Sequence, residues 1–136
     1  SLRNYQRTLE DYSDYVEIAR NAGAGETLDR IIPEIYNEAM FPGTAMLYSF
    51  PSYVYSLWQE YSVEELEYIA SFCKEKGIPA ATVYWEYWSE ETEKIFEKNG
   101  ISLYVYTVND RDQARRYISQ GAEGICTDFL TAEDLW

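Results

Sequence analysis

Short runs of apolar, β-branched and aromatic residues alternate along the chain with stretches of helical periodicity. Five runs have the length and composition of β-strands: residues 30–36, 52–58, 78–85, 101–108 and 123–127. Pro33 lies inside the first run. Because proline has no backbone N–H to donate, we expect that strand at an edge of the sheet. Strands that alternate with single helices predict a parallel β-sheet with helices packed outside it, an α/β fold.

The stretches between these runs carry helix signals. Apolar residues three and four positions apart predict a helix over 5–22, and residues 37–48 favour a second helix weakened by Pro42-Gly43. Further helices are predicted where a capping residue follows a strand. The expected caps are Ser62 with Glu65 in a capping box, Ser89, Asn109 or Asp110, and Thr131. Acidic residues after Ser62 and Ser89 are expected to complement the helix dipoles.

Length and charge restrict the functions that this chain can have. A chain of 136 residues is enough for one domain with a real core. Its net charge of −13 argues against nucleic acid and against an anionic membrane surface, because both require a basic face. The chain has no histidine, which removes the commonest general base and zinc ligand. The periodicity fits a doubly wound open sheet, and it also fits part of a (βα)₈ barrel, which typically needs about 250 residues.

Two motifs near the end of the chain favour the barrel. Tyr104-Val-Tyr-Thr-Val-Asn109 and Gly124-Ile-Cys-Thr-Asp128, joined by a predicted helix, resemble the last two strands of the glycerophosphodiester phosphodiesterases. Asp29-Arg-Ile-Ile-Pro-Glu-Ile-Tyr-Asn37 resembles a middle strand of the same family. The resemblance implies that residues 1–136 are a single partial domain, the C-terminal five-strand portion of a TIM barrel that is incomplete in this chain.

The resemblance also implies what this chain lacks. The family's three leading strands carry His-Arg-Gly, Glu-x-Asp with a second His, and an acid-x-Lys pair, which together bind a divalent cation and supply the acid and base. None of these groups can be placed in this sequence, so we expect the chain to be inactive by itself. An intact family member is expected to use Ca²⁺ or Mg²⁺ to hydrolyse a glycerophosphodiester to an alcohol and glycerol phosphate.

Candidate site residues follow from the barrel geometry, because the active face of a βα barrel is built from the C-terminal ends of its strands. Strand alternation places Leu103, Val105 and Thr107 under the helices and turns Tyr104 and Tyr106 toward the barrel interior. Tyr106 stands where the family usually has tryptophan. The candidate pocket residues are Glu34, Tyr36, Trp58, Gln59, Tyr84, Trp85, Tyr106, Asn109 and Asp128. Structural roles remain open for them, as core filling for Tyr106, helix capping for Asn109 and loop organisation for Asp128.

Two alternatives stay open beside the hydrolase. One is a non-catalytic half-barrel that self-associates or binds a small polyol. The other is an unrelated flavodoxin-like domain, although no phosphate-binding glycine loop follows any predicted strand. Five parallel strands cannot close a barrel, so the sheet edges and interior face would be exposed. We therefore expect a homo-oligomer, or a missing N-terminal half, to cover them.

Overall fold

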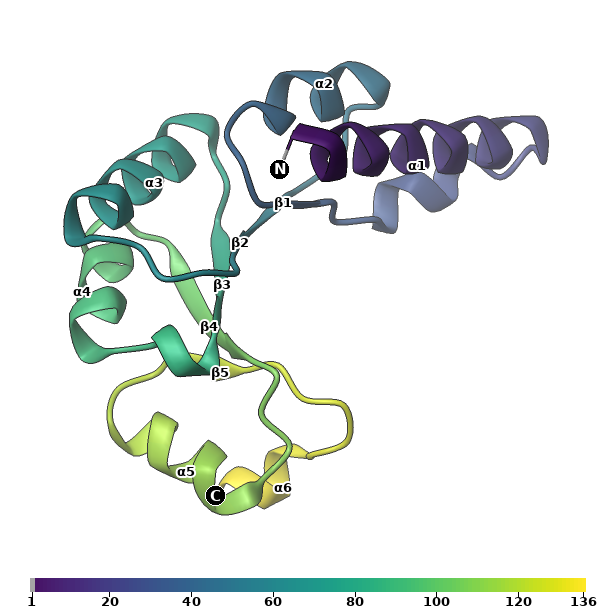
Figure 1. Cartoon of the computed structure of the whole chain (residues 1–136). Coiled ribbons are helices and arrows are strands. Elements are labelled where there is room, and N and C mark those ends of the chain that lie inside the picture. Colours follow the sequence, from purple (N-terminus) through teal and green to yellow (C-terminus); the bar gives the residue numbers. More distant parts are fainter. Residues whose placement is uncertain (1) are drawn as a thin grey trace. The chain divides into compact units, whose positions relative to one another are not determined.

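The computed structural model describes residues 2–136, with side chains from residue 5 onward. The chain divides into two compact units: an N-terminal unit of residues 1–54 and a C-terminal unit of residues 55–136. No helix in the described part of the chain combines the length and apolar character needed to cross a membrane. The elements, with η for 3₁₀ helices, run in the order α1 (Leu2–Asn21), η1 (Gly25–Arg30), β1 (Glu34–Ile35), α2 (Met40–Leu47), β2 (Val54–Leu57), α3 (Val63–Lys76), β3 (Ala80–Tyr84), η2 (Trp85–Tyr87), α4 (Glu90–Lys98), β4 (Ser102–Tyr106), α5 (Arg111–Ser119), β5 (Gly124–Ile125) and α6 (Ala132–Leu135) (Figure 1).

In the N-terminal unit, helix α1 packs against α2 and η1. Val16, Leu28 and Met40 are buried in this unit. The helices approach closely where Gly43 of α2 meets Leu9 of α1, because a Cβ atom built on Gly43 would lie 3.0 Å from Leu9 Cδ1. The glycine that weakens α2 by propensity therefore makes room for the packing of α1.

The strand predicted at residues 30–36 is mostly wrong. Only Glu34 and Ile35 form β1, and the preceding segment Gly25–Arg30 is the 3₁₀ helix η1. Pro33 explains the short strand, because it cannot donate to a ladder and contributes only its carbonyl, which accepts from the Val54 N–H at 3.1 Å. The predicted edge position is confirmed, since β1 is the first strand in the sheet order.

The α2 helix runs uninterrupted through Pro42. Pro42 is the third residue of α2, where a backbone N–H has no partner within the helix, so the proline ring removes no hydrogen bond. The Thr44 hydroxyl donates to the carbonyl of Met40, one turn earlier in the helix, at 2.9 Å.

The strands follow the order β1-β2-β3-β4-β5 in one sheet. Strands β3 and β4 are parallel, with Ala80 opposite Ser102 and Tyr84 opposite Tyr106, and β5 pairs in parallel with β4. The predicted parallel α/β architecture is confirmed. A flavodoxin-like domain would reverse its strand order at a switch point, and this sheet does not, so that alternative is excluded.

The two faces of β3 and β4 differ in the C-terminal unit. Helices α3 and α4 pack against each other and cover one face (Figure 1). Val83, Leu103 and Val105 are buried on that face. Tyr84, Tyr104 and Tyr106 alternate with them and are only half-buried. This confirms the predicted split of β4, except at Thr107, which is exposed because the strand ends at Tyr106.

The predicted helix caps at Ser62, Ser89 and Asp110 are confirmed in the C-terminal unit. The Ser62 hydroxyl accepts from the Glu65 N–H at 3.2 Å, and the Glu65 carboxylate accepts from the Ser62 N–H at 2.7 Å. The Ser89 hydroxyl accepts from the Thr92 N–H at 3.1 Å. Asp110, rather than Asn109, caps α5. These bonds satisfy N–H groups that have no partner within the helix.

Candidate functional site

An aromatic cluster stands at the C-terminal ends of β3 and β4 on the half-buried face of the sheet. It consists of Tyr84, Trp85, Tyr87 and Tyr106. The Tyr84 ring centroid lies 5.8 Å from that of Tyr106, 5.6 Å from that of Trp85 and 5.8 Å from that of Tyr87. Tyr84 and Tyr106 meet because they are directly opposite in the parallel register, and cross-strand pairs of this kind stabilise a sheet. The Tyr106 hydroxyl donates to the Leu57 carbonyl at 3.3 Å, which links β4 to the end of β2.

Asn109 joins the loops that follow β4 and β5. Its Nδ2 donates to Asp128 Oδ2 at 2.8 Å, and its Oδ1 accepts from the Asp128 backbone N–H at 2.9 Å and from the Thr127 hydroxyl at 3.0 Å. Three bonds through one amide fix the side chain of Asn109 and hold the Asp128 carboxylate at an exposed position. Two of the predicted site residues are thus brought together, in a loop-bridging arrangement.

Gly124 is required beneath the neighbouring ring of Tyr104. The two residues are paired between β4 and β5, and a Cβ atom built on Gly124 would lie 2.4 Å from Tyr104 Cδ1. No side chain other than hydrogen fits there without moving the ring. This contact sets the position of the half-buried aromatic face at its β5 end.

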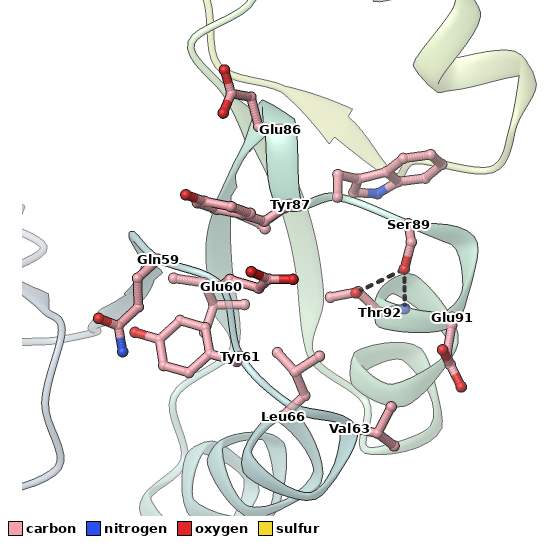
Figure 2. A pocket seen from close by; sticks show the side chains of 13 residues that line it. Gln59, Glu60, Tyr61, Val63, Leu66, Glu86, Tyr87, Ser89, Glu91 and Thr92 are labelled. Carbon is pink, nitrogen blue, oxygen red and sulfur yellow. Dashed lines mark hydrogen bonds between the residues drawn. The ribbon is translucent and has the colours of Figure 1, made fainter.

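Trp58 and Gln59 follow the end of β2 and are exposed, with half of the Trp58 surface accessible. Gln59 lines a pocket of about 280 Å³ that opens between the starts of α3 and α4 (Figure 2). Buried Leu57 and Val83 also line this pocket. Because Val83 and Tyr84 are consecutive in one strand, the pocket lies on the helix-covered face, opposite the face that carries Tyr84. Gln59 is therefore not part of the aromatic cluster.

Sequence reasoning missed this pocket. Its walls come from the loops after β2 and β3 and from the first turns of two helices, so no contiguous motif marks it. The only available signal was the concentration of carboxylates near the ends of neighbouring strands, including Glu60 and Glu86.

Glu34 and Tyr36 are bonded to α1 within the N-terminal unit. The Glu34 backbone carbonyl accepts from the Tyr12 hydroxyl at 2.7 Å, while the carboxylate of Glu34 is exposed. The hydroxyls of Tyr36 and Thr8 are hydrogen bonded at 2.9 Å. These bonds anchor the β1 segment to α1, and a pocket role for either residue stays a prediction.

Glu93 departs from the expected role of a solvated helix-dipole partner. Its side chain is buried, and Trp88 Nε1 donates to Glu93 Oε2 at 2.8 Å. Burial raises the pKa of the Glu93 carboxyl above its usual range; the Trp88 hydrogen bond opposes this shift, and the negative charge of Glu123 adds to it. Trp88 also packs edge-on against Tyr117 at 5.3 Å, so Glu93 connects the start of α4 with α5 through the indole.

The described residues do not fit a divalent cation. Among them, no three His, Cys, Asp or Glu side chains lie close enough together to hold a metal ion. The Asp128 carboxylate at the strand ends is bonded to an amide rather than grouped with other acids. A cation used by the family would need ligands other than these side chains.

Three solved structures share the fold at low sequence identity. A protein from Silicibacter pomeroyi assigned as a glycerophosphoryl diester phosphodiesterase has a TM-score of 0.68 and 15% identity over 94% of this chain and 43% of its own. A phosphodiesterase from Oleispira antarctica, in complex with the product sn-glycerol-3-phosphate, has a TM-score of 0.63 and 12% identity over 94% of this chain and 47% of its own. A glycerophosphodiester phosphodiesterase from Parabacteroides distasonis has a TM-score of 0.60 and 16% identity over 91% of this chain and 48% of its own.

The chain thus spans less than half the length of these three solved structures. Its five parallel strands and alternating helices correspond to part of their TIM barrels, which confirms the predicted fold class. No curated protein sequence matches the chain. The model of the glycerophosphoryl diester phosphodiesterase family matches residues 44–132, well over half of the chain. The chain therefore belongs to the glycerophosphoryl diester phosphodiesterase family.

Proposed function

We propose that this chain supplies a substrate-binding wall of a glycerophosphodiester-hydrolysing site, and that it needs other polypeptide to supply the chemistry. The observation that carries the proposal is the contact of Tyr84 with Tyr106, 5.8 Å between centroids, at the C-terminal ends of two barrel-type strands. Flat aromatic rings at this position suit the carbon skeleton of glycerol or of the leaving alcohol. The Asn109–Asp128 pair in the loops after β4 and β5 offers polar groups for hydroxyls.

We expect the phosphate of the substrate to be bound by groups that this chain does not supply. The chain carries 24 acidic and 11 basic residues, and no histidine. A phosphodiester anion requires neutralisation, and its cleavage by water requires one group to accept a proton and another to protonate the departing alkoxide. The family resemblance assigns these tasks, together with a Ca²⁺ or Mg²⁺ ion, to strands that have no counterpart in this sequence. We therefore infer that the chain alone does not turn over glycerophosphodiesters.

Binding of sn-glycerol 3-phosphate tests the wall directly. In an NMR titration of the isotopically labelled chain, we expect weak binding that shifts the ring resonances of Tyr84 and Tyr106. Tyr106→Leu should weaken binding several-fold, whereas Tyr106→Phe, which keeps the ring, should retain most of it. Tyr68 is an exposed tyrosine on α3, and Tyr68→Leu is the matched control. Equal effects of Tyr106→Leu and Tyr68→Leu would rule out a wall at Tyr106.

A non-catalytic, self-associating half-barrel is the second candidate. The strand order leaves β1 and β5 as sheet edges, and Tyr84, Tyr104 and Tyr106 are half-exposed on a face that no described helix of the C-terminal unit covers (Figure 1). Open edges and aromatic faces favour association with a second copy or with another part of a barrel. We expect light scattering to give the mass of a dimer or larger species. A monomer of 15.9 kDa at all concentrations would exclude self-association.

A further inference from the structure

The pocket between the starts of α3 and α4 plays no part in the proposed substrate wall of Tyr84 and Tyr106. Its floor is apolar, formed by side chains that include buried Leu57, Leu66 and Val83. Tyr61 and Tyr87 belong to its walls. Its volume of about 280 Å³ is near the lower end of the range for small-molecule sites, about 300–1,000 Å³. The pocket can therefore hold a small organic group against apolar and aromatic surface.

Carboxylates set the electrostatic sign of this pocket. Glu60, Glu86 and Glu91 line it, and no Lys or Arg of the described chain does. Figure 2 shows the Glu60 carboxylate extending toward the middle of the pocket, in view between the rings of Tyr61 and Tyr87. The three acids come from separate loops and a helix turn, so they line one pocket only in the folded C-terminal unit. The carboxylates of Glu86 and Glu91 lie at its edge, and only that of Glu60 extends toward its middle (Figure 2).

The N-termini of two helices oppose this negative charge with positive partial charges. The magnitude of those partial charges decides the sign of the pocket. The first turns of α3 and α4 contribute residues to the pocket, and each helix N-terminus is equivalent to about +0.5 elementary charge. The side chains of Ser62 and Ser89 already accept from N–H groups of those turns, so fewer donors remain for an anion. Three carboxylates outweigh two half-charges, so the lining of the pocket is negative on balance. An anionic ligand is therefore disfavoured.

The lining also distinguishes an organic cation from a metal ion. Hard cations such as Mg²⁺ and Ca²⁺ require several oxygen ligands at once, and no group of three such side chains lies close enough among the described residues. Tyrosine faces next to carboxylates attract cations that carry an apolar surface, above all alkylated ammonium groups. We propose that this pocket binds a small organic ammonium cation, held by Glu60 and by the rings of Tyr61 and Tyr87. The proposal does not depend on the contact of Tyr84 with Tyr106, because Val83 of the pocket lining and Tyr84 point to opposite faces of β3. Tyr87, which follows β3, belongs both to the aromatic cluster and to the pocket wall.

Titration of the whole chain with tetramethylammonium chloride tests the proposal, with tert-butyl alcohol as a neutral probe of similar shape and sodium chloride to match ionic strength. We expect tetramethylammonium to shift the backbone resonances of Glu60 and Tyr87 and the indole resonance of Trp88, which lines the pocket, while Trp136 stays unchanged. A cation–aromatic contribution predicts binding about 2- to 30-fold tighter than that of tert-butyl alcohol. Equal affinity for the two probes would overturn the proposal.

Two substitutions locate the site. Glu60→Gln removes one charge from an exposed loop residue and should weaken tetramethylammonium binding at least about threefold, within the range of a partly screened ion pair. Tyr87→Leu should weaken it as much or more, while Tyr87→Phe keeps the ring and should retain binding. The matched control is Glu64→Gln, an exposed acid in the first turn of α3 that does not line the pocket. Unchanged binding in both Glu60→Gln and Tyr87→Leu would contradict the assignment, as would larger shifts at the same residues with inorganic phosphate.

Discussion

The two units of this chain hold their helices in place by different means. In the C-terminal unit, α3, α4 and α5 each begin with a residue whose side chain accepts from a backbone N–H of the first turn. In the N-terminal unit, η1 and α2 have no side-chain cap. There, hydroxyls on α1 reach distant segments instead: Tyr5 and Tyr12 donate to the carbonyls of Ala39 and Glu34.

This difference explains which helix starts can be predicted from local sequence signals. A cap and the residue that it satisfies are three positions apart, so Ser62, Ser89 and Asp110 mark their helices in the sequence itself. The bonds from α1 join residues 22 and 34 positions apart and leave no local pattern. The starts of the helices are therefore marked by local hydrogen bonds in the C-terminal unit, whereas η1 and α2 of the N-terminal unit depend on contacts between elements.

The largest expected effect is on the sheet of the C-terminal unit. Gly124→Ala would place a methyl group 2.4 Å from Tyr104 Cδ1, so the ring or the strand must move. We expect a loss of about 2–3 kcal/mol in the free energy of unfolding, at the upper end for overpacking, measured by urea denaturation. Combining it with Tyr104→Leu should recover part of that loss, since the two sites are in contact. Additive effects would show that the contact is not the cause.

A smaller effect is expected from one of the bonds that replace caps in the N-terminal unit. Tyr12→Phe removes the hydroxyl that donates to the Glu34 carbonyl at 2.7 Å and keeps the ring. A hydrogen bond of this kind contributes about 0.5–1.5 kcal/mol, and we expect a loss in that range. Tyr15 is a more exposed tyrosine on the same helix, and Tyr15→Phe should be neutral. Equal losses from both changes would argue against an anchoring role for Tyr12.

A pH-dependent effect is expected at Glu93. Because burial raises the pKa of this carboxyl in the fold, the protonated form is the one that the fold favours. Its contribution to stability is complete below the unfolded value of about 4.3 and is lost as pH rises through the raised pKa. Glu93→Gln cannot ionise and still offers Trp88 an acceptor.

Thermal melts of the variant at several pH values check this sign. At pH 7, Glu93→Gln should melt at a higher temperature than the parent chain, because the variant does not have to bury a charge. The difference should shrink below pH 4. Glu67→Gln changes an exposed acid on α3 and should show neither effect. A gain for Glu93→Gln that grows toward acid pH would have the wrong sign for this account.

The smallest effect is expected from a second glycine-to-alanine substitution, Gly43→Ala in the N-terminal unit. In Gly43→Ala the new Cβ would lie 3.0 Å from Leu9 Cδ1, the end of a flexible side chain, while alanine improves helix propensity by about 1 kcal/mol. These effects oppose each other, and we expect a net change within about 0.5 kcal/mol. A loss as large as that of Gly124→Ala would mean that α1 and α2 pack as rigidly as the sheet.

The sequence predicted the site in part, for reasons that individual residues make clear. Strand alternation correctly separated Tyr106 from buried Val105, and register then brought Tyr106 to Tyr84. The Asn109–Asp128 bridge was not predicted, because it depends on two loops closing on each other across 19 positions. The prediction of a strand over residues 30–36 was wrong, because it gave more weight to the β-branched composition than to the backbone donor that Pro33 lacks.

The most direct test of the central claim follows a glycerophosphodiester by phosphorus NMR in the presence of the purified chain with Mg²⁺ or Ca²⁺. The account predicts that the substrate stays intact, although sn-glycerol 3-phosphate binds and shifts the rings of Tyr84 and Tyr106. Release of glycerol phosphate by the 136-residue chain, abolished by a substitution in its own side chains, would show that the chemistry resides here after all.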